Sequence, residues 1–200
     1  MNTVKINCDA SSISEHTNAG FGLVFRTSSG TFRATKCGWC RTFSAQEAEV
    51  VALLRAVQWA IRHNVQNLVI EGDNLTTIKF LQGKTKDVNW KCLAVLNEVQ
   101  QLADKLVSFQ GFQFVDRRTN KVADLLAKEG RRSSSTIFWT DQAPRFLIPA
   151  IAFDTVKAYE LCNSNDSTFV SCSSRINPTN SVIGRATHHG LVSEEPELAD

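Results

Sequence analysis

Residues 44–74 constrain the fold of this chain most strongly, because they combine a long amphipathic helix with a short buried strand. Apolar side chains recur at i, i+3, i+4, i+7 and i+11, which places them on one helical face. They are Val50, Leu53, Leu54, Val57 and Ile61. Ser44 and Glu47 form an S-x-x-E capping box. The run at 68–70 is short, rich in branched side chains and soon followed by Gly72, which favours a strand.

Two glutamates in the first turns of this helix compete for a position that faces a sheet. At about 100° per residue, Glu47 and Glu49 fall on opposite edges of the apolar stripe. The helical line from Glu49 continues through Leu53, Ala56 and Ala60, which permit close approach to a sheet. The line from Glu47 runs out to a polar residue, Gln58. If one of the two points inward, it should be Glu49.

The length and composition predict one well-cored domain with an appendage, since the chain has 200 residues of which 42% are hydrophobic. The net charge of +2 is too small to indicate a nucleic-acid-binding protein by itself. The part up to Gly130 is mildly basic and the remainder is mildly acidic. This asymmetry fits a phosphate-rich partner, although solvated surface charge explains it equally well.

Cysteine usage and the N-terminal sequence indicate a reduced intracellular compartment, without distinguishing nucleus from cytoplasm. The six cysteines show no framework spacing, and the opening MNTVKINCDA has neither a basic n-region nor an apolar h-region. Cys37 and Cys40 form a C-x-x-C, but Trp39 between them fits strand alternation, so a metal role is disfavoured. No run approaches the roughly 20 apolar residues of a membrane span. We expect a soluble monomer.

The hydrophobic pattern along the chain predicts an α/β domain with the element order βββαβααβα. A period-2 run at 4–8 and two further strand candidates at 20–26 and 31–40, which a short turn joins, predict an antiparallel meander. The later elements are a short helix over 75–82, a helix over 90–106, a strand over 109–115 and a last helix that Gly130 ends. We therefore expect a mixed five-stranded sheet with helices on its faces.

The domain should span residues 1–130, because the sequence changes character after Gly130. We expect residues 131–162 to form a linker and a loosely docked segment or loose helix, since Pro144 and Pro149 interrupt its apolar residues. Residues 163–200 are rich in Ser and Asn and weakly apolar, which predicts a disordered tail.

Four acidic residues lie at the ends of predicted elements: Asp9, Glu49, Asp73 and Asp124. If the first and fourth strands are neighbours, Asp9 and Asp73 come together, and helices on the sheet bring in the other two. Clustered carboxylates repel unless a cation neutralises them, and oxygen-only ligands select hard cations such as Mg²⁺. Two ions ~3.5–4 Å apart could hydrolyse a phosphodiester. Taken singly, Asp73 or Asp124 is more readily explained as a cap or surface charge.

Four ordered motifs carry a resemblance to a known family: NCDAS around Asp9, AEVVALLRAV around Glu49, LVIEGDN around Asp73 and NKVADLLAKEG around Asp124. From about Val4 to Gly130 the sequence resembles the ribonuclease H-like superfamily, specifically a type 1 ribonuclease H domain of the divergent plant and retroelement branch. The resemblance implies a ribonuclease H-like fold in which the four acids are catalytic and bind two Mg²⁺ ions, for which Mn²⁺ can substitute. It also implies endonucleolytic cleavage of the RNA strand of an RNA–DNA hybrid, leaving 3′-hydroxyl and 5′-phosphate ends.

Two positions depart from the pattern of this family. Phe114 stands where members commonly have a His that assists proton transfer or product release. Ala45 replaces an amide side chain that reads the minor groove of the hybrid, a task for which Ser44 could substitute. Slow turnover is therefore expected. The alternatives are a weak or inactive module that binds nucleic acid or protein, and a retroelement-derived fragment with no independent role.

Ten residues are candidates for holding the nucleic acid, most of them because a positive charge can position a phosphate backbone. The basic ones cluster before the last helix and in the connection after Gly83, where Trp90 adds a stacking surface, although solvated faces explain the charges about as well. Trp39, Trp59 and Trp139 are expected in the core. The ten candidates are Ser44, Asn74, Lys84, Lys86, Trp90, Lys91, Arg117, Arg118, Asn120 and Lys121.

Overall fold

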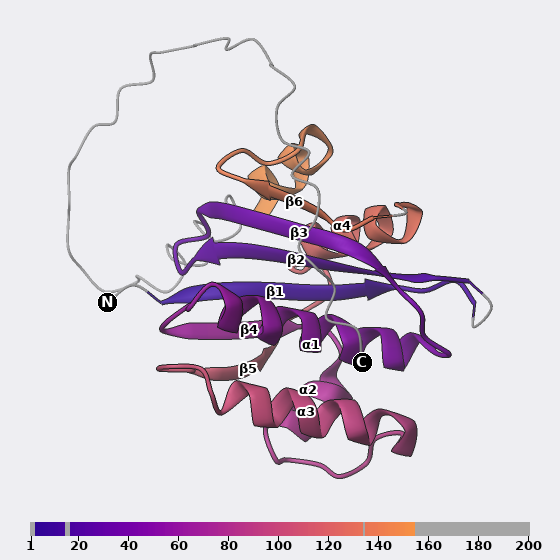
Figure 1. Ribbon diagram of the computed structural model, residues 1–200. Coiled ribbons are helices and arrows are strands. Elements are labelled where there is room, and N and C mark those ends of the chain that lie inside the picture. The colour runs from indigo at the N-terminus through magenta and orange to yellow at the C-terminus, as the bar shows by residue number, and fades with distance from the viewer. Residues whose placement is uncertain (1–2, 15–16, 134, 155–200) are drawn as a thin grey trace, which may run out of the picture.

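The computed structural model describes residues 3–14, 17–133 and 135–154 and contains a six-stranded mixed sheet (Figure 1). The strand order is β5-β4-β1-β2-β3-β6. The strands are β1 (Val4–Ser11), β2 (Ala19–Thr27), β3 (Phe32–Cys40), β4 (Leu68–Gly72), β5 (Gly111–Phe114) and β6 (Ile137–Thr140). β1 pairs antiparallel with β2 and parallel with β4, so the condition under which Asp9 and Asp73 come together, that the first and fourth strands are neighbours, is met.

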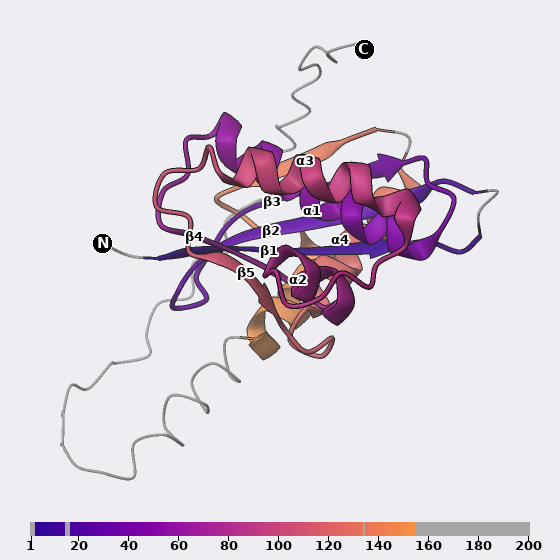
Figure 2. The same ribbon diagram turned by 90° about the horizontal axis from the view of Figure 1, so that it is seen from below.

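Helices cover both faces of this sheet (Figure 2). α1 (Ala45–Arg62) and α3 (Leu93–Ala103) pack on one face and enclose the larger apolar core, to which α2 (Leu75–Leu81) adds Ile78. α4 (Lys121–Arg132) packs on the opposite face over a smaller core. Two short 3-10 turns are η1 (Trp90–Cys92) and η2 (Arg145–Leu147). The predicted α/β class is confirmed.

The start of α1 forms as the capping box predicts. Ser44 Oγ accepts the backbone N–H of Glu47 at 3.1 Å, and the Glu47 carboxylate accepts the backbone N–H of Phe43 at 2.7 Å. These bonds satisfy donors that a helix start leaves unpaired. Glu47 is therefore a capping residue, and Glu49 is left to face the sheet.

α4 lies unusually close to the sheet because glycines remove side chains at the contact. A Cβ placed on Gly22 of β2 would lie 2.4 Å from the Ala123 carbonyl oxygen. A Cβ on Gly130 would lie 2.4 Å from the carbonyl oxygen of Gly38. The expectation that Gly130 ends the helix is wrong: α4 continues to Arg132, and Gly130 provides close packing instead of a C-cap.

The sheet has one strand more than the five that the sequence predicts. β6 pairs antiparallel with the outer side of β3, Leu147 is fully buried against α4 and β2, and Arg26 pairs with Asp154 at 3.0 Å. The expectation of a linker and loosely docked segment over 131–162 is thus corrected for 135–154, which packs on the domain. The predicted disordered tail at 163–200 lies outside the described residues.

The structure also bears on three smaller expectations. Cys37 and Cys40 are buried in β3 as free thiols, and the one described cluster with metal-binding geometry does not include them. Trp39 is 43% exposed, so its expected place in the core is wrong, whereas Trp59 is buried. Within the described ranges, none of the helices has the length and apolar character needed to span a membrane.

Candidate active site

Three carboxylates converge at one edge of the sheet. Asp9 lies in β1, Asp73 directly follows β4, and Glu49 is in the second turn of α1. Because Cys8 pairs with Gly72 in the parallel ladder, the next residue on each strand is an aspartate, and the two lie side by side. One oxygen from each of the three acids lies within 4.8 Å of the other two. We call Asp9, Glu49 and Asp73 the acid cluster.

Burial and mutual repulsion make the acid cluster costly to ionise. Burial, followed by the charge of Asp73, raises the pKa of Asp9 to about 7. Burial, followed by the charges of Asp9 and Asp73, raises the pKa of Glu49 to about 9. The buried thiol of Cys8 has a pKa well above its usual value for the same reasons, burial first and then Glu49. The acid cluster therefore holds protons near neutral pH unless a cation replaces them.

Arg117 already supplies one positive charge to the acid cluster. Its Nε donates to Asp73 Oδ2 at 3.3 Å, and this hydrogen bond raises the pKa of Arg117. Arg117 comes from the loop between β5 and α4 and was predicted from the sequence to bind phosphate. The structure instead brings it onto an acid that lies 44 residues away in sequence.

Asp124, the fourth predicted acid, lies outside the acid cluster and is paired with two lysines. Lys121 Nζ lies 2.6 Å from Asp124 Oδ2, and Lys128 Nζ lies 2.7 Å from Asp124 Oδ1. Partial burial by itself raises the pKa of Asp124, but the hydrogen bonds from Lys121 and Lys128 outweigh it and lower the pKa. Sequence reasoning assigned Lys121 to phosphate and missed Lys128, which its i, i+4 spacing from Asp124 could have indicated.

The donor set of the acid cluster fits a hard divalent cation. All three ligand groups are carboxylates, they are largely buried, and two of them have raised pKa values that a cation would lower. Asp124, which is paired with Lys121 and Lys128, lies outside this donor set. Asp124 is close enough to act electrostatically on Asp9.

Three polar candidates for nucleic-acid contact have structural partners instead. Ser44 and Asn74 cap α1 and α2, and the Asn74 oxygen accepts the Thr77 N–H at 3.1 Å. Asn120 is fully buried and donates to the Cys8 carbonyl at 2.9 Å, which joins α4 to β1. The prediction that Asn120 contacts nucleic acid is wrong, because a fully buried amide cannot reach a bound strand. Its contact fixes the strand end that carries Asp9.

The other basic candidates remain on the surface. Residues 84–91, which we call the 84–91 segment, carry three of the predicted lysines and Trp90. Trp90 is 75% exposed, and Lys91 Nζ lies 5.9 Å from the centroid of its ring. Arg118 is exposed and pairs with Asp116 at 2.9 Å. These groups keep the exposure that contact with a phosphate backbone requires.

Both departures from the family pattern lie near the acid cluster. Phe114 pairs with Gly72 at the end of the β4–β5 ladder and is therefore a close neighbour of Asp73. Its ring is 44% exposed and has no group that can transfer a proton. Ala45 is the first residue of α1 and is exposed.

Solved structures of ribonucleases H share this fold. The N-terminal RNase H domain of a Mycobacterium tuberculosis protein is 22% identical, with a TM-score of 0.59, and the match covers 66% of this chain and 95% of that chain. RNase H1 from the archaeon Halobacterium salinarum is 24% identical, with a TM-score of 0.56 and coverage of 64% and 96%. LC11-RNase H1 in complex with an RNA/DNA hybrid is 18% identical, with a TM-score of 0.59 and coverage of 65% and 97%.

The family assignment follows from the sequence match. No curated protein matches the chain. Residues 7–130 match the family described as reverse transcriptase-like, and this range contains the acid cluster and Asp124. The range exceeds half of the chain. The chain therefore belongs to the reverse transcriptase-like family.

Proposed function

We propose that this chain is a Mg²⁺-dependent endonuclease that hydrolyses the RNA strand of RNA–DNA hybrids. The observation that carries the proposal is the convergence of Asp9, Glu49 and Asp73, whose ligand oxygens lie within 4.8 Å of one another. Family membership and the ribonuclease H neighbours support a ribonuclease activity in general. LC11-RNase H1, solved with an RNA/DNA hybrid, supports the choice of substrate.

In the proposed reaction, the four acidic residues hold the metal ions. When bound, two Mg²⁺ ions would activate a water on one side of the scissile phosphodiester and stabilise the leaving oxygen on the other. Asp9, Glu49 and Asp73 would supply the oxygen ligands, and Asp124 would complete the second position in place of its pairs with Lys121 and Lys128. Mn²⁺ can substitute, because it accepts the same oxygen donors.

The surrounding cations are suited to hold the substrate. Arg117 keeps its guanidinium at the acids, where it can donate to a phosphate oxygen near the scissile bond. Arg118 and the 84–91 segment present further charges and the Trp90 ring at the surface. Phosphate contacts of this kind fix the orientation of a duplex without reading its sequence.

A second candidate function is a nucleic-acid-binding or protein-interaction module with little catalysis. Two observations favour it. Phe114, beside Asp73, cannot shuttle a proton, and the loss of general acid–base assistance typically costs about 10²–10⁴-fold in rate. In addition, Asp73 and Asp124 are already paired with Arg117, Lys121 and Lys128.

A cleavage assay with matched variants separates the two functions. Purified protein is incubated with an RNA–DNA hybrid labelled on the RNA and with Mg²⁺, and the fragments are compared with those from Asp73→Asn. Asp104→Asn, which removes an exposed carboxylate at the end of α3, is the control. We expect fragments with 5′-phosphate ends from the wild type and from Asp104→Asn only. Hybrid binding without cleavage above Asp73→Asn would establish the module instead.

A further inference from the structure

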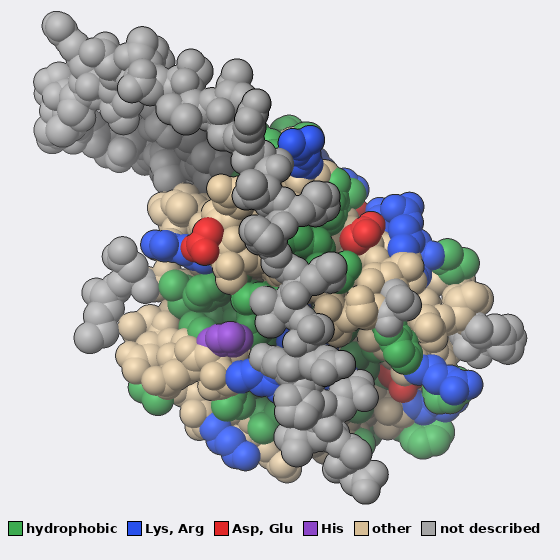
Figure 3. All heavy atoms as spheres, turned by 45° about the horizontal axis from the view of Figure 1, so that its top comes forward, with side chains coloured by type: hydrophobic (Ala, Val, Ile, Leu, Met, Phe, Trp, Pro, Cys, Tyr) green, Lys and Arg blue, Asp and Glu red, His purple; other side chains and the backbone are tan. Residues whose placement is uncertain are grey.

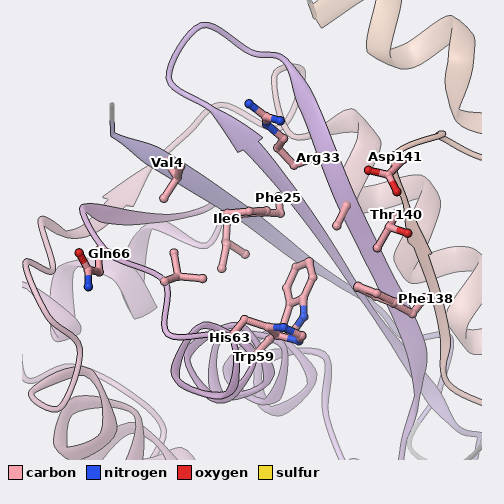
Figure 4. Close-up of a pocket in the computed structure, with 12 residues that line it drawn as sticks. Val4, Ile6, Phe25, Arg33, Trp59, His63, Gln66, Phe138, Thr140 and Asp141 are labelled. Atoms are coloured by element: carbon pink, nitrogen blue, oxygen red, sulfur yellow. The ribbon is translucent and has the colours of Figure 1, made fainter. Parts of the chain in front are cut away.

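A second concave site lies at the opposite end of α1 from the acid cluster. A cavity of about 510 Å³ opens between the C-terminal end of α1 and the strands β1, β2, β3 and β6 (Figure 4). Glu49 lies near the start of α1 and His63 caps its end, a separation of roughly 20 Å along the helix. Ligand pockets have volumes of roughly 300–1,000 Å³. The cavity is therefore of ligand size and separate from the proposed metal site.

The backbone is irregular where it borders this cavity. Phe25 pairs with Ala34 and Arg26 pairs with Phe32, so Arg33 is the extra residue of a β-bulge, and it lines the cavity. Facing it, Asp141 has a positive φ of 62° and donates its N–H to the Arg33 carbonyl at 3.2 Å. Bulges re-aim side chains and are frequent beside binding sites. Here the bulge brings a guanidinium to the rim of an apolar cavity.

Aromatic rings form one wall of the cavity. Trp59 of α1 contacts Phe138 of β6 edge to face, with centroids 5.8 Å apart, and His63 lies nearly parallel to Phe138 at 6.2 Å. The rings of Trp59 and Phe25 also contact each other, with centroids 5.9 Å apart, and close the floor of the cavity. Phe138 is 42% exposed, so part of its surface is open to a ligand. Such a wall suits a flat ring, because stacking does not depend on the identity of the ring.

Basic side chains lie at and beside the same cavity. Arg33 lines it, and Lys36 is the β3 partner of Phe138. Burial, followed by the charges of Arg62 and Arg55, lowers the pKa of Lys36, which indicates a positive local potential. Of the described lining residues, Asp141 alone is acidic. Figure 3 shows a histidine side chain beside hydrophobic side chains on this face, with Lys and Arg side chains near them.

We propose that this cavity binds a nucleoside monophosphate, with the base against Trp59 and Phe138 and the phosphate near Arg33. The aromatic wall accounts for the base, and the guanidinium of Arg33 accounts for the anion. Asp141, at the rim beside Thr140 and Phe138 in Figure 4, offers a carboxylate that can hydrogen bond to the edge of a base. This site is independent of the acid cluster and of the proposed nuclease activity.

An NMR titration with AMP tests the proposal directly. Full-length protein is titrated with AMP in EDTA, which removes divalent ions and so separates this site from the acid cluster. We expect the Trp59 indole N–H to shift and the exposed Trp90 indole N–H to stay in place. Titrations with adenosine and with inorganic phosphate show whether base and phosphate are both needed, and each should bind more weakly than AMP.

Matched variants locate the binding site. Phe138→Ala should weaken AMP binding by about tenfold, the effect of removing one stacking side chain. Phe146→Ala is the control, because Phe146 has the same exposure of 42% and does not line the cavity. Arg33→Gln should weaken AMP binding and leave adenosine binding unchanged. Arg132→Gln, at the exposed end of α4, should change neither.

Several results would overturn the proposal. They are the absence of a Trp59 shift at millimolar AMP, equal weakening by Phe138→Ala and Phe146→Ala, and loss of AMP binding in Asp73→Asn. A tetranucleotide blocked at both ends that binds more tightly than AMP would also overturn it, because the site would then hold a strand and not a free nucleotide. None of these results depends on whether the protein cleaves a hybrid.

Discussion

Arg117 and Asp73 form an ion pair whose two side chains differ in exposure. The side chain of Arg117 is 84% exposed, and that of Asp73 is only 2% exposed. The two are joined from Nε to Oδ2 at 3.3 Å. An exposed arginine is free to move, whereas Asp73 is fixed at the end of β4 beside Asp9. Arg117 is thus a removable counter-ion of the acid cluster.

Removing this counter-ion should strengthen Mg²⁺ binding. Arg117→Gln leaves Asp73 without a competing cation, so we expect the Mg²⁺ dissociation constant to fall several-fold, since each tenfold change corresponds to about 1.4 kcal/mol. Calorimetric titration with Mg²⁺ measures the change. Arg118→Gln is the matched control, because Arg118 pairs with Asp116 outside the acid cluster. Weaker Mg²⁺ binding in Arg117→Gln would show that the arginine organises the site and does not compete for it.

Neutralising Asp73 should stabilise the metal-free protein. Asp73→Asn removes a charge that raises the pKa values of both Asp9 and Glu49, so it relieves repulsion in the folded state. We expect a melting temperature in EDTA higher by a few degrees, the shift that about 1 kcal/mol produces in a domain of this size. Mg²⁺ should raise the melting temperature of the wild type and not that of the variant. An unchanged melting temperature in EDTA, as expected for Asp104→Asn, would show that repulsion is not the cause.

The same raised pKa values set the direction of the pH dependence. The pKa of Asp9 rises from 3.8 to about 7 on folding, and that of Glu49 from 4.5 to about 9. At a pH between the unfolded and the folded pKa of each group, the folded state binds a proton that the unfolded state has released. The metal-free protein therefore loses stability as the pH rises from about 4 to about 9. Protons also compete with Mg²⁺. Its affinity should therefore increase from pH 6 to pH 9, and an affinity independent of pH would contradict the raised values.

The features that could be predicted from sequence are those that local pattern and strand pairing determine. Periodicity favoured Glu49 over Glu47 as the inward-facing residue, and the family resemblance pointed to the same choice. The capping bonds of Ser44 and Glu47 confirm that Glu47 is a capping residue. The fold class followed from alternating runs and helical stripes. The parallel pairing of β1 with β4 then brings Asp9 to Asp73 without further information.

The features that could not be predicted depend on partners distant in sequence. β6 has four residues and becomes a strand only through its pairing with β3, about 100 residues earlier. The local sequence around Gly130 does not distinguish a glycine that ends a helix from a glycine that permits close packing. The ion pair between Arg117 and Asp73 likewise arises from tertiary contacts. So does the β-bulge that directs Arg33 towards the cavity. Local pattern carries no information about any of these.

Restoring an imidazole beside the acid cluster should accelerate cleavage if the proposed reaction holds. Phe114 is partly exposed and pairs with Gly72, the residue before Asp73, so Phe114→His brings a titratable imidazole to the end of the sheet that carries the acid cluster. We expect single-turnover cleavage of a hybrid to rise by about 10-fold or more, within the range for general acid–base assistance. Phe114→Gln is the control, because an amide is polar but does not titrate. Equal rates for the two variants would show that polarity, and not proton transfer, limits the wild type.

A glycine-to-alanine change at the α4–β3 contact should reverse its usual effect. In an ordinary helix interior, Gly→Ala stabilises by up to about 1 kcal/mol. At Gly130 the new Cβ would lie 2.4 Å from the Gly38 carbonyl oxygen, so α4 must move away from the sheet. We expect Gly130→Ala to lower the free energy of unfolding by about 1–3 kcal/mol, the usual cost of overpacking, as measured by urea denaturation. Arg132→Ala, exposed in the same helix, should stay within about 0.5 kcal/mol of the wild type. Because α4 also carries Asp124, the displacement should weaken any Mg²⁺ binding that depends on this residue, whereas stabilisation by Gly130→Ala would show that α4 does not pack on β3 as described.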